Sequence, residues 1–547
     1  MLLLVVTTLG SFFVQWAVPD ALTGSDPYFH IRQAWLMRQG LGDPSQWFAL
    51  STFTAMPTDL EYGFHALLIP FTSGDLIVGA KLAAVSGMTL YALACWWVLA
   101  RLGVAAPALW TGAGLVMSPV FFHVMTQLRP LLVTTSLLLI GLYGLIARRR
   151  WLVGSTVALW TWLHHGYPLL LAAIGLHVLL QLAQRRTLDW RLLGWTLAGW
   201  LAGLATHPAP WSYVRLLGMH YAAHAQASLF GSTLPFATEL DRWPAGMQNA
   251  TAMIVLYATN AVWLWRRRRA QPQPRGASDA GVFLMLVLTL VWAMALRHLR
   301  FVGYLVPVTC LASAYCWQEP LRLAGWQHQR LFKRLRRRGA VRSRLVASLV
   351  GQPSLLAGLI VLTLLLGRAV YALRISASVS LSQSVLFEEP HRLGRWLGAS
   401  VPPQSVVIQN RWDLFPWLFF HDYDSRFLNG FDPIDSYLAH PRSFWRWHHL
   451  VYEARWCDRE TCPAASPVPD DLPAAVSHWL WETWEADYVA LYAPWSHPGF
   501  QALLEDRRFF EPVFRAPRSA VYRLRLPDPR NARHPASIAR AHPNPAP

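Results

Sequence analysis

Charged residues are scarce in this sequence. Asp, Glu, Lys and Arg make up 14% of its 547 residues, whereas an average soluble domain contains about 25%. Lysine is almost missing, since Lys81 and Lys333 are the only two. This shortage of charge, with 54% hydrophobic residues, excludes a disordered chain and a purely soluble enzyme. Many apolar runs approach the ~20 residues that cross a bilayer, so the sequence predicts a multi-span membrane protein.

Cysteine is also rare, and five residues exclude a small scaffold held together by disulfides. Cys95, Cys310 and Cys316 lie in apolar runs, where we expect them to pack as small hydrophobic side chains. Cys457 and Cys462 lie in a polar region, where a local disulfide is predicted if that region is extracytoplasmic. A zinc site is less favoured there, because no second cysteine pair accompanies the first.

The net charge of +18 is not spread over one domain. Basic residues stand in short arginine runs between apolar segments, so nucleic acid is not predicted as a partner. With the N-terminus inside, every run falls on the cytoplasmic side, as the positive-inside rule requires. A chain with so little lysine is typical of a GC-rich bacterial genome, and we predict a multi-pass protein of the bacterial inner membrane. The runs are Arg101, 148–150, 185–186, 266–269 and 334–338.

Eleven apolar runs predict about 11 transmembrane helices within residues 1–374. The first is interpreted as a retained span rather than a signal peptide, because no basic start precedes it. Two long outer loops are expected at 19–75 and 207–248, and a short outer turn at 164–168. The runs are 2–18, 76–100, 103–125, 130–147, 151–163, 168–183, 190–206, 249–265, 281–296, 301–316 and 347–373.

The composition changes after residue 374. Residues 375–527 alternate short apolar runs with helical patterns, and we predict a periplasmic α/β domain there. Its expected strands include 405–408, 488–492 and 520–524, and its expected helices include 386–397 and 498–506. Residues 528–547 are rich in Pro and Ala and predict a disordered tail.

A few polar side chains stand where the predicted spans end. Asp26 follows the first span and precedes Pro27, so it is a candidate base or metal ligand, or the cap of the next helix. Glu239 lies in the long outer loop. Arg297 and Arg300 lie on the outer side, where they can bind an anionic phosphate or lipid headgroups.

These features, in this order, resemble the catalytic subunit of oligosaccharyltransferase and, more broadly, the GT-C membrane glycosyltransferases. The resemblance runs along nearly the whole chain and is weak between the motifs. The similar segments are Asp26–Phe29, Trp162–Tyr167, Phe236–Glu239, Arg300–Phe301 with Tyr304, and the block from Arg395 to Asp413, which is similar to the family's helix, Pro turn, strand and WWDYG motif.

The resemblance implies an enzyme that moves a sugar or oligosaccharide from a polyprenyl-(pyro)phosphate carrier to a protein, lipid or polysaccharide acceptor on the outer side. Asp26 is then the general base, and Glu239 orients the acceptor or holds a metal together with Asp26. The carrier phosphate binds to arginine, and other side chains line the cavity or the acceptor side. The residues implied to bind substrate are Arg129, Arg297, Arg300, His165, Tyr167, Trp412 and Asp413.

The chain departs from the family at two motifs. Only Trp412 and Asp413 remain of WWDYG, so an Asn-x-Ser/Thr acceptor is not expected. The family's second acidic motif is replaced by residues 123–130, which contain no carboxylate. Asp26 and Glu239 alone make a poor oxygen cage for Mg²⁺ or Mn²⁺, and a metal-independent mechanism is favoured. These losses leave open a second interpretation, a non-catalytic protein that binds or translocates polyprenyl lipid, or an inactive relative.

Overall fold

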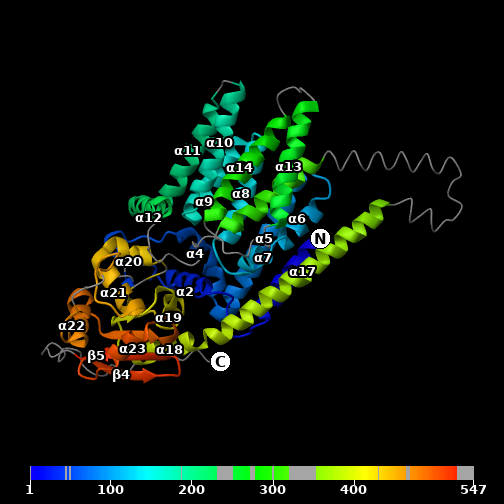
Figure 1. Cartoon of the computed structure of the whole chain (residues 1–547). Coiled ribbons are helices and arrows are strands. Elements are labelled where there is room, and N and C mark those ends of the chain that lie inside the picture. Colours follow the sequence, from blue (N-terminus) through cyan, green and yellow to red (C-terminus); the bar gives the residue numbers. More distant parts are fainter. Residues whose placement is uncertain are drawn as a thin grey trace, which may run out of the picture. The chain divides into compact units, whose positions relative to one another are not determined.

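The computed structural model describes residues 2–43, 46–47, 51–185, 188–230, 251–270, 277–297, 301–318, 353–428, 430, 432–463 and 468–525. The chain forms two compact units (Figure 1). The helical unit contains Met1–Ser45 and Ala55–Glu388, and the sheet unit contains Gln46–Thr54 and Glu389–Pro547. The predicted boundary after residue 374 lies inside a helix, because α17 continues to Leu386.

Each of the eleven predicted apolar runs falls on a helix wherever the structure describes it. The 103–125 run differs from the others because it forms two helices rather than one. These helices are α1 (Leu2–Trp16), α5 (Leu76–Arg101), α6 (Pro107–Val116), α7 (Pro119–Thr126), α8 (Leu131–Ile146), α9 (Arg150–Leu163), α10 (Pro168–Arg185), α11 (Trp190–Ala205), α13 (Thr251–Ala270), α14 (Ala277–Arg297), a helix over 302–318, and α17 (Pro353–Leu386).

The break between α6 and α7 bends the chain by 90°. Pro119 has no N–H to donate and cannot continue α6, so a new helix begins there. Ser118 is in the extended conformation and its hydroxyl accepts from the Phe121 N–H, which caps α7. The sequence pattern missed the break because both halves are apolar.

The helices differ in their ability to cross a membrane. Among the described residues, three segments are long and apolar enough by themselves: Leu76–Arg101, Ala280–Arg297 and Thr363–Leu386. The bent pair α6–α7 adds a fourth if it counts as one span. The other predicted spans are helical but shorter or less apolar.

Large apolar side chains cover the outer faces of these helices. Phe13 on α1 is 69% exposed, and Val370 on α17 is 65% exposed. An apolar surface of this extent is what lipid requires and water disfavours. Together with the helical architecture, it describes a multi-span membrane protein.

Helices α9 and α11 touch backbone to backbone. A Cβ atom at Gly199 would lie 2.1 Å from the Gly154 carbonyl oxygen, and one at Gly203 would lie 2.6 Å from that of Ala158. Gly199 and Gly203 are four residues apart on one face of α11, the small-residue spacing that lets membrane helices approach closely. An ion pair joins the N-terminal ends of the same two helices, where Arg150 Nε lies 3.0 Å from Asp189 Oδ2.

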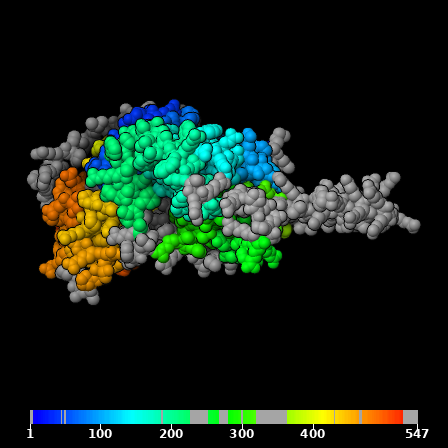
Figure 2. Space-filling view, turned by 90° about the horizontal axis from the view of Figure 1, so that it is seen from above, coloured from blue at the N-terminus to red at the C-terminus, as the bar shows by residue number. Residues whose placement is uncertain are grey.

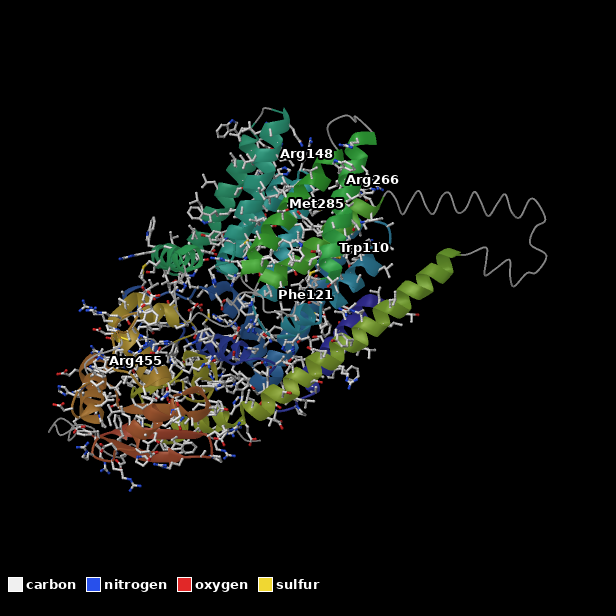
Figure 3. The ribbon with its side chains drawn as sticks, in the orientation of Figure 1. Trp110, Phe121, Arg148, Arg266, Met285 and Arg455 are labelled. Atoms are coloured by element: carbon white, nitrogen blue, oxygen red, sulfur yellow. A yellow bond between two sulfur atoms is a disulfide. The ribbon has the colours of Figure 1, made fainter. Side chains whose placement is uncertain are left out.

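The two predicted outer loops contain helices of their own. The first holds α2 (Asp26–Arg38), α3 (Thr52–Ala55), α4 (Tyr62–Leu68) and the short 3₁₀ helix η2 (Ile69–Thr72). In the second, residues Pro210–Phe230 form α12, a helix that the sequence pattern does not reveal. In Figure 3, Arg148 and Arg266 lie toward one end of the helical unit, and α2 and α4 lie toward the other end (Figures 1 and 3). Figure 2 is seen from above Figure 1, so the end of the helical unit toward which Arg148 and Arg266 lie faces the viewer.

The sheet unit contains a mixed five-stranded sheet, in the order β2-β1-β3-β5-β4. Strand β1 pairs in parallel with β2 and β3, and β5 pairs antiparallel with β3 and β4. The predicted α/β architecture is therefore confirmed. Its strands are β1 (Val406–Gln409), β2 (Arg426–Phe427), β3 (Tyr488–Tyr492), β4 (Phe510–Arg515) and β5 (Ser519–Leu524), and its helices are α18 (Glu388–Ser400), η6 (Trp412–Leu414), α19 (Phe415–His421), α20 (Pro433–Ala439), α21 (Pro441–Glu453), α22 (Leu472–Trp484), η7 (Ala493–Trp495) and α23 (Pro498–Leu504).

The central strands are buried along their whole length. Every residue of β1 and β3 is buried, and the apolar runs that this burial requires, residues 406–408 and 488–492, are visible in the sequence. Strand β2 has only two residues and was not predicted. Residues from the first outer segment join this unit, since the Trp47 indole N–H donates to the Tyr423 carbonyl oxygen at 2.6 Å.

Cys457 and Cys462 form the disulfide that was predicted. The other three cysteines are buried as free thiols, also as expected. The predicted tail over 528–547 lies outside the described residues.

A half-buried histidine pair in the sheet unit makes stability depend on pH. Nδ1 of His391 lies 3.0 Å from Nε2 of His421. Burial, assisted by the charge of Arg395, lowers the pKa of His391 to about 4. Below its ordinary pKa of about 6.5 the unfolded chain therefore binds a proton that the folded chain does not. We expect the free energy of unfolding to fall by about 1–3 kcal/mol between pH 6.5 and pH 4 through this residue.

The substitution His391→Gln tests this expectation, because an amide can still donate to His421 but does not titrate. Unfolding of the full chain in detergent is followed by tryptophan fluorescence at several pH values. The variant should show a flatter pH dependence than the wild type over this range. Equal slopes in both proteins would contradict the assignment to His391.

Candidate active site

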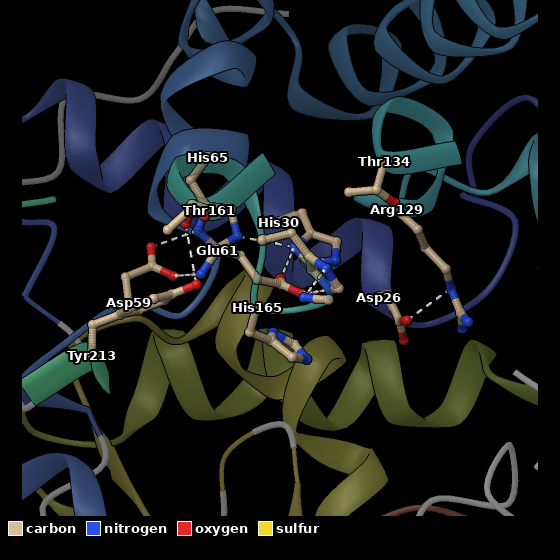
Figure 4. Close-up of polar contacts among 12 residues, drawn as sticks. Asp26, His30, Asp59, Glu61, His65, Arg129, Thr134, Thr161, His165 and Tyr213 are labelled. Carbon is tan, nitrogen blue, oxygen red and sulfur yellow. Dashed lines mark hydrogen bonds and ion pairs between the residues drawn. The ribbon is translucent and has the colours of Figure 1, made fainter. Parts of the chain in front are cut away.

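Asp26 forms an ion pair with Arg129 in the helical unit. Arg129 Nε lies 2.8 Å from Asp26 Oδ2, and both side chains are about 15% exposed (Figure 4). The Ser25 hydroxyl donates to Asp26 Oδ1 at 2.9 Å. Ser25, not Asp26, is the N-cap residue of α2, and its side chain makes no capping hydrogen bond. Asp26 is therefore not the cap of α2, and its carboxylate is engaged by Arg129 instead.

The backbone before Asp26 is held by contacts from distant segments. Gly24 has φ +87°, and a Cβ atom there would lie 3.1 Å from the Gln127 side chain, so only glycine suits this position. The Gly24 N–H donates to Oε1 of Gln383 on α17 at 3.2 Å. Asp26 is thus positioned by α17 on one side and by residues 127–129 on the other.

Lys81 fixes the end of α1, a few residues earlier in the chain. It is 1% exposed, and its ammonium group donates to the carbonyl oxygens of Val18 at 2.6 Å and Pro19 at 2.5 Å. These carbonyl groups lie just past the end of α1, where no further helical turn can satisfy them. The ammonium group of Lys81, on α5, donates to them instead.

Residues 123–130 present nitrogen groups where the related family has acids. His123 lies on α7, with Nδ1 3.0 Å from the Ser376 hydroxyl. Nε2 of Gln127 lies 3.2 Å from Nε2 of His123. Arg129 follows and reaches Asp26. A guanidinium thus lies beside Asp26, in the segment where the acidic motif of the resembled family is missing.

A second polar cluster lies on α2 and α4, close to the turn after α9 (Figure 4). His30 Nδ1 lies 2.9 Å from His65 Nε2 and 3.3 Å from Glu61 Oε2. His65 Nδ1 lies 2.6 Å from Asp59 Oδ2. Nε2 of His164 lies 3.4 Å from Glu61 Oε1. We call these five residues the histidine cluster.

The cluster is strongly desolvated. Burial lowers the pKa of His30 to about 3, although Glu61 acts in the opposite direction. The pKa of Glu61 is lowered because its histidine neighbours outweigh the effect of burial, which would raise it. The pKa of His65 is raised, since the carboxylate of Asp59 outweighs burial.

Local sequence explains how the cluster assembles. Glu61 and His65 are four residues apart at the start of α4 and therefore share one face. Gly63, between them, lets α4 approach the end of α9, since a Cβ atom there would lie 2.5 Å from the Trp162 carbonyl oxygen. His30 lies one helical turn after Asp26 on α2.

The structure brings together some of the predicted site residues. Asp26 and Arg129 are paired, and the His165 ring lies against that of His164 in the histidine cluster, with ring centroids 4.0 Å apart. Tyr167 is buried in the same turn. Arg297 is exposed at the last residue of α14. Glu239 and Arg300 lie outside the described residues.

Trp412 and Asp413 lie in the sheet unit, on η6 directly after β1. Arg411 Nε lies 2.8 Å from Asp413 Oδ1, and the guanidinium of Arg411 lies 4.6 Å from the centre of the Trp495 ring. Burial raises the pKa of Asp413, although Arg411 acts in the opposite direction. Asp413 is therefore a carboxylate already engaged by an arginine.

His30, Asp59 and His65 were not predicted as site residues from the sequence. A signal was present, because Asp59, Glu61 and His65 are spaced so that a carboxylate and an imidazole share a helix face. Only the fold could show that His30 and His164 meet them.

A Mg²⁺ or Mn²⁺ ion at Asp26, which the sequence already disfavours, is also a poor fit for the described side chains there. A hard divalent cation requires several oxygen ligands. One neighbour of the Asp26 carboxylate is a guanidinium at 2.8 Å, a positive group that repels a metal ion. The second predicted ligand, Glu239, lies outside the described residues. No step of the chemistry below uses a metal at Asp26.

Comparison with known proteins shows a relationship of fold. No protein-family model matches the chain, and no curated protein matches its sequence. Two solved structures of ArnT from Cupriavidus metallidurans are similar along 95% of this chain and 97% of theirs, at 14% identity. The TM-score is 0.51 for the form bound to undecaprenyl phosphate and 0.52 for the apo state. ArnT is a GT-C glycosyltransferase, and the predicted GT-C-like fold is confirmed.

Proposed function

We propose that this chain, which shares the fold of ArnT, is a GT-C membrane glycosyltransferase that uses a polyprenyl-phosphate sugar donor. The observation that carries the proposal is the Asp26–Arg129 ion pair at the start of α2. This pair places a carboxylate and a guanidinium side by side. Sugar transfer from a phosphate carrier requires both, a base for the acceptor and a positive group for the leaving phosphate. Undecaprenyl phosphate bound to ArnT supports a carrier of this class.

In the proposed reaction, Asp26 accepts the proton of an acceptor hydroxyl as its oxygen attacks the anomeric carbon. The bond between that carbon and the phosphate oxygen breaks, and polyprenyl phosphate leaves with one more negative charge. Arg129 stabilises that charge, because a guanidinium matches phosphate oxygens in geometry and sign. Before the donor binds, Asp26 and Arg129 neutralise each other. The carrier phosphate competes for Arg129 and leaves Asp26 able to act as the base.

The contacts within the helical unit support the proposed topology. Segments predicted on the outer side meet there, since residue 26 contacts residue 129 and residue 61 contacts residue 164. Arg148 and Arg266, predicted on the cytoplasmic side, lie toward the opposite end of this unit (Figure 3). We therefore place the N-terminus inside and the site on the outer side of a bacterial inner membrane, with eleven helices crossing it and the sheet unit in the periplasm.

We further propose that the acceptor is not an Asn-x-Ser/Thr peptide, and that the protein differs in this from oligosaccharyltransferase. Asp413 is the remnant of the motif that binds the acceptor hydroxyl in the resembled family. Here its Oδ1 lies 2.8 Å from Arg411, and Arg411 is also stacked on Trp495. A protein, lipid or polysaccharide hydroxyl remains as the acceptor.

Lipid-linked sugars in a deletion strain and a complemented strain test the function. Without the protein, one polyprenyl-linked sugar should accumulate and one surface glycoconjugate should lose a residue. Complementation should reverse both changes. A translocating protein would leave the donor on the inner side and shorten several glycans at once. An unchanged lipid-linked pool and glycan profile would contradict the proposal.

A further inference from the structure

Three metal-ligating atoms converge in the histidine cluster, apart from the Asp26–Arg129 pair. They are His30 Nδ1, His65 Nε2 and a carboxylate oxygen of Glu61, and all lie within 4.8 Å of one another. The distances from His30 Nδ1 to the other two are 2.9 and 3.3 Å. In a tetrahedral site with bonds of about 2.0–2.1 Å, neighbouring ligand atoms lie about 3.3 Å apart. The cluster therefore has nearly the spacing that surrounds one small cation.

Two further side chains orient these atoms. Asp59 Oδ2 lies 2.6 Å from His65 Nδ1, so that nitrogen donates to Asp59 and Nε2 faces the centre of the cluster. His164 Nδ1 accepts from the Gly166 N–H at 2.9 Å, so its Nε2 carries the proton and faces Glu61 Oε1. Carboxylate partners of ligating histidines, and hydrogen-bond donors to ligating carboxylates, are typical of metal centres.

Burial favours this arrangement over a loose surface cluster. The side chains of His30 and His65 are 2% and 0% exposed, and that of Glu61 is 18% exposed. The partial exposure of Glu61 provides an entry path for an ion. The cluster also joins separate elements, since His30 lies on α2 and His65 on α4.

We propose that His30, Glu61 and His65 form a Zn²⁺ site with an open fourth coordination position. Two imidazoles and one carboxylate are a donor set that Zn²⁺ takes in three-ligand sites. Mg²⁺ and Ca²⁺ prefer oxygen ligands and are disfavoured by this set. The ion links α4 to the helix that begins at Asp26, and so holds Asp26 in place. This site goes beyond the proposed transfer reaction, none of whose steps uses the ion.

Two other groups with metal-ligating side chains occur among the described residues. Glu61, His164 and His165 form one, which shares Glu61 with the proposed site, and His449, Cys457 and Cys462 form the other. Both thiols are joined in the disulfide and do not bind zinc in that form. The experiment is therefore carried out without reductant, so that bound zinc reports on the histidine cluster.

The test measures zinc in the untagged full-length protein purified in detergent. The protein is stripped with EDTA, exposed to Zn²⁺, freed of excess ion and analysed by mass spectrometry of the metal. We expect the wild type to retain about one Zn²⁺ per chain, and His65→Ala and Glu61→Gln to retain close to none. The matched control is His391→Gln, which removes an imidazole from another, half-buried histidine pair and should retain the wild-type amount.

A milder variant keeps the test valid if the ligand variants fold poorly. Asp59→Asn leaves all three ligands but weakens the acceptor of His65 Nδ1, and should lower zinc affinity by about 10–100-fold. Replacing Zn²⁺ with Co²⁺ should give the wild type the visible absorption bands of a four-coordinate site. The proposal is overturned if the wild type retains no more zinc than His65→Ala, because the cluster is then only a hydrogen-bonded network.

The two proposals fail separately. Zinc retention is measured without any glycosyl donor, so an inactive transferase does not affect it. A variant at Asp26 should retain the wild-type amount of zinc while losing transfer. Loss of zinc without loss of transfer would leave the glycosyltransferase assignment intact.

Discussion

Replacing Asp26 by Asn should lower the rate of sugar transfer by about 10²–10⁴-fold, the range by which a positioned general base accelerates a reaction. Asparagine keeps the size of the side chain and its contacts with Ser25 and Arg129, but it cannot accept a proton from the acceptor. The fold should therefore survive. The measurement is transfer from a polyprenyl-phosphate sugar by the purified protein, together with its thermal unfolding.

Asp189→Asn is the matched control for this substitution. Asp189 also lies beside an arginine, Arg150, but at the end of the helical unit that we place on the cytoplasmic side. It accepts from the Leu192 N–H as the cap of α11, and asparagine can do the same. This variant should transfer sugar at the wild-type rate. Equal rates in Asp26→Asn and Asp189→Asn would mean that Asp26 is not the base.

Replacing Arg129 by Gln should lower transfer by about 10²–10³-fold, as expected when a donor that stabilises developing negative charge is removed. The loss should appear in kcat more than in KM, because the leaving phosphate gains its extra charge only as the bond breaks. Arg129→Lys should recover part of the rate, since an ammonium carries the charge but not the paired N–H geometry. Steady-state kinetics with varied donor at saturating acceptor measure both constants.

Arg150→Gln is the control, as it removes an arginine from the comparable pair at the other end of α9 and α11. Its kcat should equal that of the wild type. If Arg129→Gln raised KM alone, Arg129 would bind the donor without assisting the departure of the phosphate. An unchanged kcat and KM would contradict any role for Arg129 at the site.

The helices were predictable from the sequence because membrane helices satisfy their own backbone and only need to be apolar. The eleven runs coincide with helices for that reason. The break at Ser118 and Pro119 was not found, since apolar composition continues through it. Helix α12 was missed because its polar and apolar residues are mixed and its sequence is not that of a span. The buried strands β1 and β3 were found, while the two-residue β2 depends on pairing alone.

The candidate site was predictable only in part, because it depends on contacts between distant segments. Asp26 could be identified from its place after the first span. Its pairing with Arg129 joins residues about one hundred positions apart, and no local pattern encodes that contact. The histidine cluster shows the same limit, since α2, α4 and the turn after α9 each contribute one or two side chains that are unremarkable alone.

The burial of Lys81 has a consequence for the chemical reactivity of the protein. Lys333 is the only other lysine in the sequence, and Lys81 is 1% exposed, with its ammonium engaged by the carbonyl oxygens of Val18 and Pro19. An amine-reactive acylating reagent can therefore reach Lys81 only when α5 separates from the end of α1. The rate of acylation at this one side chain would then measure how often the segment leading to Asp26 opens.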